Sequence, residues 1–384
     1  MKIFIDENIP YGKAFFESFG DVTTFSGREV NAEQVKDADV LLVRSITQVN
    51  DSLLHLNKSL QFVGTATIGT DHIDQSYLTQ RNINFSSAPG CNKVSVAEYV
   101  LSALLILSEK NQFNLSSKTV GIVGAGNTGS AVYQVLTGLG VECKLYDPPL
   151  KRAGDEREFC DFADILASDI ISLHVPKIPD GENKTVHLFD KTVLATLNQQ
   201  QILINACRGE VIDNNALLSL AREGNIPTLV LDVWENEPNI NTELLPFVTL
   251  ATPHIAGYSL DGKARGTEML YQALCQQLDM KVILKSADFV VKPSISEVKL
   301  EQSTSAELIK SLVHLIYDVR RDDALFRNIV NDDKGFDNMR KNYRERRELS
   351  TLTLTCTESA NPFNQSTDLQ SIDLTKIGFT VKKL

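Results

Sequence analysis

The stretch "TVGIVGAGNTG" (residues 119–129) decides the fold of the central part of the chain. An apolar run, 119–123, is short enough for a buried strand, and the glycine pattern GxGxxG separates it from a helix-like stretch that follows. Gly124, Gly126 and Gly129 permit a tight turn in which backbone N–H groups can approach an anion at the start of the helix. A lone GxGxxG is a weak signal, but this strand–turn–helix context predicts a dinucleotide site.

The next apolar run, "VECKLYD" (141–147), ends in an acidic residue. Asp147 lies 18 residues after Gly129, where a carboxylate can accept hydrogen bonds from both hydroxyls of an adenosine ribose and repels a 2′-phosphate. This favours NAD over NADP as the cofactor. The alternative is that Asp147 only begins the turn "DPP".

Further apolar runs continue the pattern on both sides of this unit. Four of them follow it, which predicts a six-stranded doubly wound (Rossmann) domain: 168–176, 200–207, 227–234 and 247–254. Four others, 2–6, 38–45, 60–67 and 83–90, alternate with helix-like stretches and predict a second parallel sheet. A long helix is expected at 94–110. Beyond about residue 286 the chain is charge-dense, with a polar, loop-like stretch at 357–367, and predicts a small third α/β domain.

Composition limits the function. The 384 residues are 42% hydrophobic and 23% charged, with a net charge of −11, which argues against a nucleic-acid or membrane surface as the main partner and favours a small ligand. Six cysteines show neither CxxC pairs nor Cys/His ligand spacing, so we expect no zinc or other metal site and reduced thiols in a cytoplasm. The chain shows no signal-peptide pattern and no apolar run of about 20 residues.

Three charged or titratable residues follow successive strands of the second series. Arg208 comes after "ILINAC", Glu237 lies in "DVWENEP", and His254 lies in "LATPHIAGYS". Each has a structural alternative: a turn cap, a solvated loop residue, and a histidine at a helix start. Together, at the carboxyl ends of parallel strands beside a nicotinamide site, they suit the oxidation of a 2-hydroxy acid.

The chemistry of that reaction explains the residue types. A permanently charged, planar arginine can hold the substrate carboxylate and polarise the carbonyl that develops. A histidine can accept the hydroxyl proton near neutral pH, and a carboxylate can orient the imidazole and stabilise its charged form. We therefore expect Arg208, His254 and Glu237 to be catalytic.

The segments "VGAGNTG", "INACRGEVID", "LDVWENEP" and "TPHIAGYS" resemble the D-isomer-specific 2-hydroxyacid dehydrogenase family over about residues 1–285. "FVGTATIGTDHID" (62–74), "LVHLIYDVRRDDA" (312–324) and "MRKNYRERREL" (339–349) are similar to one branch of that family, whose substrate is 4-phospho-D-erythronate in the synthesis of pyridoxal phosphate. The resemblance implies an NAD-binding domain (95–256) inserted in a flavodoxin-like substrate domain (1–94 and 257–285), with a C-terminal domain (286–384) that forms a homodimer.

The resemblance also implies roles for single residues. Substrate contacts are expected from Ser45, Thr67 and Tyr258. NAD contacts are expected from Asn127, Thr128, Ala206, Asp232 and Gly257, besides the glycines and Asp147. The branch has a threonine at the position of Val175. A backbone contact with NAD survives the replacement of threonine by valine, whereas a hydroxyl contact does not, so we expect Val175 to contact NAD through its backbone.

The phosphate of such a substrate needs a cation. Arg44, which ends the run "DVLLVR" beside Ser45, is the best placed in the N-terminal half. A second source of positive charge for the phosphate is the run Arg344, Arg346 and Arg347. The alternative is that this run forms a solvated helix face whose charges pair with Glu345 and Glu348.

Two other functions remain open. The chain could be a dehydrogenase for another acid, such as 3-phosphoglycerate or glycerate, although the segment "IYDVRRDDA" argues against both. It could also be a non-enzymatic NAD-sensing scaffold of the same fold, which intact catalytic residues do not exclude.

Overall fold

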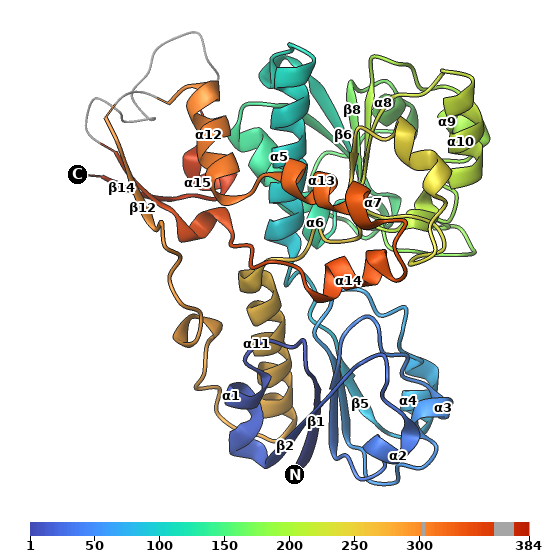
Figure 1. The fold of residues 1–384 in the computed structure, drawn as a ribbon, viewed down its shortest axis with the longest axis vertical. Helices are drawn as coiled ribbons and strands as arrows, with labels where there is room; N and C mark the ends of the chain where they lie inside the picture. Colours follow the sequence, from blue (N-terminus) through green and yellow to red (C-terminus); the bar gives the residue numbers. More distant parts are fainter. Residues whose placement is uncertain (302–303, 357–371, 384) are drawn as a thin grey trace. The chain divides into compact units, whose positions relative to one another are not determined.

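The chain forms two compact units in a computed structural model that describes residues 1–301, 304–356 and 372–383 (Figure 1). Unit 1 consists of residues 1–92 and 259–291, and unit 2 of residues 93–258 and 292–384. The polar stretch 357–367, predicted as a loop, lies outside the described residues. The predicted domain boundaries at residues 94, 256 and 285 stay proposals.

Unit 1 contains a parallel five-stranded sheet in the order β2-β1-β3-β4-β5, which is the flavodoxin-like order that the fold class predicted. Its elements are β1 (Lys2–Asp6), α1 (Gly12–Phe16), η1 (Glu17–Phe19), β2 (Asp21–Phe25), α2 (Ala32–Val35), β3 (Val40–Val43), α3 (Asp51–Leu54), β4 (Phe62–Thr65), α4 (Gln75–Gln80), β5 (Asn84–Ser86), α11 (Leu260–Gln277) and η5 (Ser286–Asp288). Strand β2 is not predicted from the sequence, because this edge strand buries only Phe25 and gives no apolar run.

Helix α11 belongs to unit 1 although it follows the whole NAD-binding region in sequence. Leu270 and Leu274 of α11 lie in one core cluster with Ile3 and Ile5 of β1. Gly64 of β4 makes room for this packing, since a side chain there would lie about 3 Å from Leu42 and Leu270. The late segment therefore completes the early sheet.

Unit 2 contains a parallel six-stranded sheet in the order β11-β10-β9-β8-β6-β7, as predicted for the dinucleotide domain. Its elements up to residue 258 are α5 (Lys93–Lys110), η2 (Leu115–Ser117), β6 (Thr119–Val123), α6 (Asn127–Gly138), β7 (Glu142–Tyr146), α7 (Pro148–Arg152), α8 (Phe162–Leu166), β8 (Ile170–Leu173), α9 (Lys191–Leu194), β9 (Ile202–Asn205), η3 (Gly209–Val211), α10 (Asn214–Arg222), β10 (Thr228–Leu231), η4 (Thr242–Phe247) and β11 (Leu250–Ala251). The strand order reverses between β6 and β8, and ligands of such sheets bind at the carboxyl ends of the strands beside that point.

The described residues of the C-terminal part of unit 2 form a three-stranded parallel sheet, β12-β13-β14, and several helices. Its elements are β12 (Glu297–Leu300), α12 (Ala306–Ile316), α13 (Val319–Ile329), α14 (Gly335–Lys341), η6 (Leu349–Thr351), β13 (Thr353–Cys356), α15 (Leu374–Ile377) and β14 (Thr380–Lys383). Figure 1 shows α12 and α15 beside α5 and α6, and residue contacts join each pair.

Helix α13 closes the edge of the six-stranded sheet. Asp323 accepts a hydrogen bond from the backbone N–H of Ala251 in β11 at 2.7 Å, and Arg327 donates to the carbonyls of Leu245 and Val248. Phe326 enters the same apolar cluster as the NAD-domain strands. The C-terminal part therefore shares its core with the NAD-binding part.

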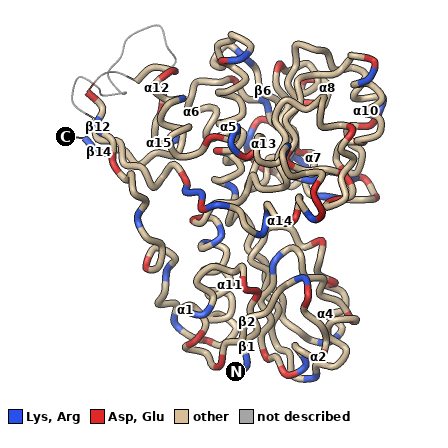
Figure 2. The backbone as a smooth tube through the Cα atoms, in the orientation of Figure 1, with Lys and Arg blue, Asp and Glu red and all other residues tan. Residues whose placement is uncertain are grey.

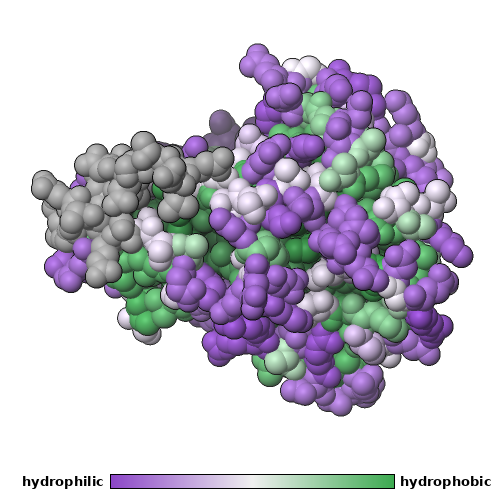
Figure 3. All heavy atoms as spheres, turned by 90° about the horizontal axis from the view of Figure 1, so that it is seen from above, coloured by the Kyte–Doolittle hydropathy of each residue, from purple (hydrophilic) through white to green (hydrophobic). Residues whose placement is uncertain are grey.

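Charged side chains are spread over most elements, and Figure 2 shows the two signs interspersed along the chain. The face seen in Figure 3 is largely hydrophilic, with small apolar areas between the polar ones. No helix among the described residues has the length and hydropathy to cross a membrane.

Arg346 links the two parts of unit 2 from a position that is 1% exposed. Its guanidinium donates to the carbonyls of Ala256 and Ser95, lies 3.5 Å from a carboxylate oxygen of Glu98, and stacks 3.4 Å from the ring centroid of Tyr317. Burial raises the pKa of Glu98 to about 8, the nearby Glu348 acts in the same direction, and the charge of Arg346 counters both.

Replacing Arg346 with Met should destabilise unit 2 by about 3–5 kcal/mol, because it leaves buried acidic groups without their cation. Urea unfolding measures the loss, and Arg321→Met, at an exposed position of α13, is the control with little expected effect. The double variant Arg346→Met with Glu98→Gln should recover part of the stability. An effect of Arg346→Met as small as that of Arg321→Met would contradict this account.

Candidate active site

Two loops at the carboxyl ends of β9 and β10 are in direct backbone contact. Gly209 allows this, because a side chain at that position would overlap the backbone of Trp234. Asn205, the last residue of β9, holds the turn: its side chain donates to the carbonyl of Arg208 at 3.0 Å and accepts from the N–H of Cys207 at 3.2 Å. The loop that carries Arg208 is thus fixed against the loop that carries Glu237.

Asp232 organises the third loop, which follows β11. Its buried carboxylate accepts hydrogen bonds from the Thr252 hydroxyl (2.7 Å) and from the N–H groups of Ile255 (2.8 Å) and Ala256 (2.9 Å). Its carbonyl also accepts from the N–H of His254 at 2.6 Å. These bonds hold His254 in a left-handed conformation, φ 58°, which a residue with a side chain rarely adopts.

Glu237 and His254 form a hydrogen-bonded pair. Glu237 Oε2 lies 2.7 Å from His254 Nδ1, and Glu237 Oε1 accepts from the N–H of Trp234 at 2.9 Å. Burial acts to raise the pKa of Glu237, but the charge and hydrogen bond of His254 and the charge of Arg340 more than offset it, so the pKa lies below its usual range. An ionised carboxylate only accepts hydrogen bonds, so Nδ1 carries the proton and Nε2 is left as the basic nitrogen.

Arg208 lies half-buried at the end of β9. One of its guanidinium nitrogens donates to the carbonyl of Cys207 at 2.7 Å. It also lies in the same sheet edge as Glu237 and His254, since β9, β10 and β11 are adjacent parallel strands. The structure therefore brings the three predicted catalytic residues to one edge, from three consecutive loops.

The glycine turn after β6 is shaped for close packing on one side and open on the other. Gly124 has φ 90°, and a side chain there would lie 2.5 Å from the carbonyl oxygen of His174, while one at Gly129 would overlap the carbonyl of Gly124. At Gly126 a side chain would meet nothing within 4 Å. Exposed Asn127 and half-buried Thr128 begin α6, so their N–H groups and this open space fit a dinucleotide pyrophosphate.

Asp147 has a structural task in addition to its predicted one. Its carboxylate accepts from the N–H of Ala125 in the glycine turn at 2.8 Å and from the N–H of Leu150 at 3.0 Å, which caps α7. The side chain is half-buried, as are Val175, Ala206 and Gly257, which follow β8, β9 and β11. Asp232 is 1% exposed and engaged by the chain, so its contact with NAD stays a prediction.

The predicted substrate residues of unit 1 follow two neighbouring strands. Arg44 and exposed Ser45 come after β3, and half-buried Thr67 comes after β4. The guanidinium of Arg44 is buried and donates to the carbonyl of Asn8 at 3.2 Å. Burial raises the pKa of Asp6, and Arg44 partly counters this, so the arginine also serves a buried acid.

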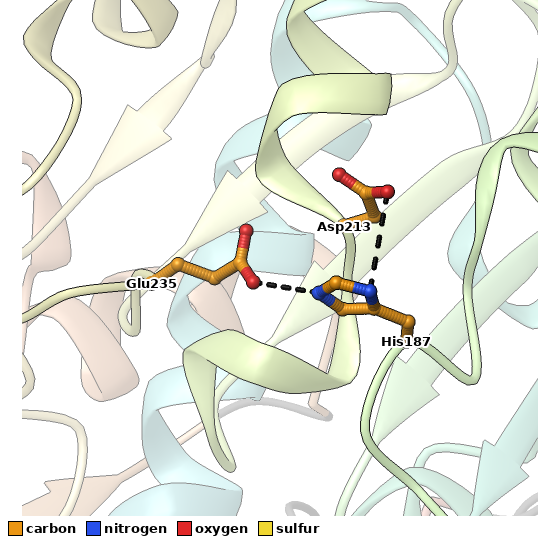
Figure 4. A group of neighbouring side chains, drawn as sticks. All are labelled: His187, Asp213 and Glu235. Atoms are coloured by element: carbon orange, nitrogen blue, oxygen red, sulfur yellow. Dashed lines mark hydrogen bonds and ion pairs between the residues drawn. The ribbon is translucent and has the colours of Figure 1, made fainter.

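His187, Asp213 and Glu235 form a further polar group in unit 2 (Figure 4). His187 Nε2 lies 2.7 Å from Glu235, whose other oxygen accepts from the N–H of Asn214 at 2.8 Å, and Asp213 caps α10 through the N–H of Ala216. His187 follows β8, so these bonds join the segment after β8 to the loops after β9 and β10 and support those loops.

The alternative of a solvated helix face for Arg344, Arg346 and Arg347 is wrong, while a role of this run in binding phosphate stays a prediction. Residues 343–348 are not helical, and Arg346 is buried within unit 2 instead of forming a solvated face. Arg344 lies 3.6 Å from the buried carboxylate of Asp322. Arg340 of α14 lies beside Tyr258 and close enough to Glu237 for its charge to act on that carboxylate. It was not predicted as a site residue. Nothing in the sequence distinguishes it from its neighbours.

Comparison with known proteins identifies the family of the chain. Residues 106–256 match the family described as "D-isomer specific 2-hydroxyacid dehydrogenase, NAD binding domain", and residues 289–371 match a domain of unknown function (DUF3410). The chain is 63% identical over 97% of its length to an erythronate-4-phosphate dehydrogenase of Psychromonas ingrahamii, covering 98% of that protein. A protein of the same name from Tolumonas auensis is 50% identical, with 99% of each chain covered.

Solved structures show the same fold. The NAD-bound 3-phosphoglycerate dehydrogenase of Entamoeba histolytica has a TM-score of 0.62 at 24% identity, covering 74% of this chain and 98% of its own. The D-lactate dehydrogenase of Aquifex aeolicus has a TM-score of 0.57 at 23% identity, covering 72% and 95%. The chain belongs to the D-isomer-specific 2-hydroxyacid dehydrogenase family, and within it to the group named erythronate-4-phosphate dehydrogenase. It is an oxidoreductase with NAD as its cofactor.

Two glycine variants separate folding from cofactor binding. Gly126→Ala should fold with normal stability, since the added methyl meets nothing, but should weaken NAD binding by about tenfold or more because it fills the space next to the helix N-terminus. Gly129→Ala should instead destabilise the domain, because its methyl overlaps a backbone carbonyl. Calorimetric titration with NAD and urea unfolding check the two effects. Unchanged NAD affinity in Gly126→Ala would show that the pyrophosphate lies elsewhere.

Proposed function

We propose that the chain oxidises 4-phospho-D-erythronate to (R)-3-hydroxy-2-oxo-4-phosphooxybutanoate with NAD, in the biosynthesis of pyridoxal 5′-phosphate (vitamin B6). The observation that carries the proposal is the Glu237–His254 pair at the sheet edge that also bears Arg208 and the glycine turn. Near full-length similarity to the curated relatives supports the choice of substrate.

His254 is the proposed base. Its Nδ1 proton is held by Glu237, so Nε2 is free to accept the proton of the C2 hydroxyl. As the imidazole gains this proton, the ionised Glu237 stabilises its charge. NAD, held by the glycine turn after β6, would supply the acceptor for the hydride that leaves C2.

Arg208 is proposed to hold the substrate carboxylate and to polarise the C2 oxygen as it becomes a carbonyl. A guanidinium suits this role because it stays charged and offers several donors in one plane. Its loop is fixed on both sides, by Asn205 and by the contact of Gly209 with Trp234, so the charge is held in place before the substrate binds.

Further substrate contacts are proposed for Ser45, Thr67 and Tyr258, with Arg44 as a cation for the phosphate. On the cofactor side, Asp147 is proposed to accept from the ribose hydroxyls, with the glycine turn at the pyrophosphate. The remaining proposed NAD contacts are those of Asn127, Thr128, Val175 (through its backbone), Ala206, Asp232 and Gly257.

The oligomeric state, the partners and the cellular location are also proposals. We propose a cytoplasmic homodimer that assembles through the C-terminal part (286–384), with a small-molecule substrate and neither nucleic acid nor membrane as a partner. The net charge of −11 and the similarity to a biosynthetic enzyme support this.

A substrate panel tests the function. Purified protein with NAD should form NADH with 4-phospho-D-erythronate at a kcat/KM at least tenfold above that for erythronate, 3-phosphoglycerate or glycerate, measured by absorbance. A preference for 3-phosphoglycerate or glycerate would assign the chain to another dehydrogenase of the family. No turnover of any acid, with NAD binding intact, would favour the NAD-sensing scaffold.

Variants of the catalytic pair test the mechanism. His254→Ala should lower kcat by roughly two to four orders of magnitude with NAD binding unchanged, which is the usual size of general acid–base catalysis. Glu237→Gln should lower kcat and change the pH–rate profile, because it removes the charge that favours imidazolium. Near-normal turnover of His254→Ala would refute its role as base.

The same acid predicts a pH dependence of stability. The pKa of Glu237 is lower in the folded protein than its ordinary value, so its contribution is fully present above about pH 4.5 and is lost as the pH falls through the folded pKa. The stabilisation that wild type has over Glu237→Gln should therefore shrink as the pH falls below about 4.5. A constant difference down to pH 3 would contradict the lowered pKa.

A further inference from the structure

Arg340 stands between two aromatic rings next to the catalytic pair. Its guanidinium carbon lies 5.8 Å from the ring centroid of Tyr258, which belongs to the loop after β11, and 5.9 Å from that of Phe336, one turn earlier on α14. The Tyr258 ring also packs edge-on against Tyr343 at 5.8 Å. Aromatic faces attract a guanidinium and hold it in place.

The guanidinium of Arg340 is only partly paired by the chain: it shares a side-chain hydrogen bond with Tyr258 and is attracted by nearby acids. Its Nε is enclosed and has no hydrogen-bond partner among the described residues. The nearest acid of the site, Glu237, already bonds to Trp234 and His254, so it attracts Arg340 at longer range without a direct bond. Asp337, on the same helix, adds a weaker attraction. A buried donor left without a partner costs free energy unless a ligand meets it.

The proposed substrate carries more negative charge than Arg208 can match. A phosphate monoester brings about 1.5 to 2 negative charges at neutral pH in addition to the carboxylate. A planar guanidinium is well suited to a phosphate, which it can bind with two parallel hydrogen bonds. Tyr258, a proposed substrate contact, lies directly against Arg340.

We infer that Arg340 binds the phosphate of the substrate, so that the C-terminal domain of unknown function supplies a specificity-determining residue to the active site. The inference rests on the proposed function, and it places the domain that matches residues 289–371 within reach of the reaction. Arg44 of unit 1 is a second proposed cation for the same dianion, and the two are tested separately.

The experiment compares equilibrium binding and kcat/KM for 4-phospho-D-erythronate and unphosphorylated erythronate. Arg340→Met should weaken binding of 4-phospho-D-erythronate and lower its kcat/KM by about 10- to 100-fold, the range for a lost hydrogen bond to a charged group. The same two quantities for erythronate should change by less than about threefold. Arg340→Lys, which keeps the charge and loses the planar fork, should fall between. Arg44→Met is measured in the same way.

Lys341→Met is the matched control, because it removes one positive charge at the exposed neighbouring position of α14 and should behave like wild type. Urea unfolding and NAD titration verify that each variant is folded. If Arg340→Met does not fold, the comparison of the two ligands is made with Arg340→Lys. Equal losses on both ligands, or none, would overturn the inference. Wild type that binds both ligands equally would instead refute the proposed function, because the preference for phosphate would be missing before any substitution.

Discussion

The buried carboxylate of Asp232 is the constraint on which the catalytic edge of unit 2 depends. It accepts three hydrogen bonds from the loop that follows β11, and Thr252 of that loop in turn contacts Tyr99 of α5 and, through its carbonyl, the indole of Trp234. Burial raises the pKa of Asp232, and the charge of His254 and these hydrogen bonds counter that tendency. Asp232 therefore fixes the backbone of His254 directly. It also holds Thr252, whose carbonyl accepts the hydrogen bond of Trp234 in the neighbouring loop, so a loop of unusual conformation becomes a rigid part of the domain.

Much of this arrangement could be predicted from the sequence because it is local. Buried parallel strands are short apolar runs, the glycine turn has a fixed spacing, and the residue at the end of a parallel strand lies at the ligand-binding edge. Arg208, Glu237 and His254 are all found by that rule, and the structure brings them to one edge. The exposed strand β2 was missed because it has too few apolar residues to be seen.

Long-range pairing could not be predicted. Arg346 and Glu98 are 248 residues apart, and no pattern in a single sequence indicates that an arginine in a charge-dense segment is buried against a carboxylate of the long helix α5. The same limit applies to Arg340, which looks like any surface arginine until α14 is placed beside Tyr258. Asp232 was predicted to contact the cofactor, and its three bonds to the polypeptide were invisible for the same reason.

The shared cores also determine the order in which the chain can fold during its synthesis. Ribosomes deliver a chain from its N-terminus at about 5–20 residues per second, yet the sheet of unit 1 needs Leu270 and Leu274, and the apolar cluster under β10 needs Phe326 and Phe336. Part of the apolar surface of each sheet therefore stays exposed until residues that are synthesised after its strands have left the ribosome. For unit 2 this lasts until α13 and α14 have left the ribosome, so the core under β10 is completed by residues that are made about 70 positions after its last strand, β11.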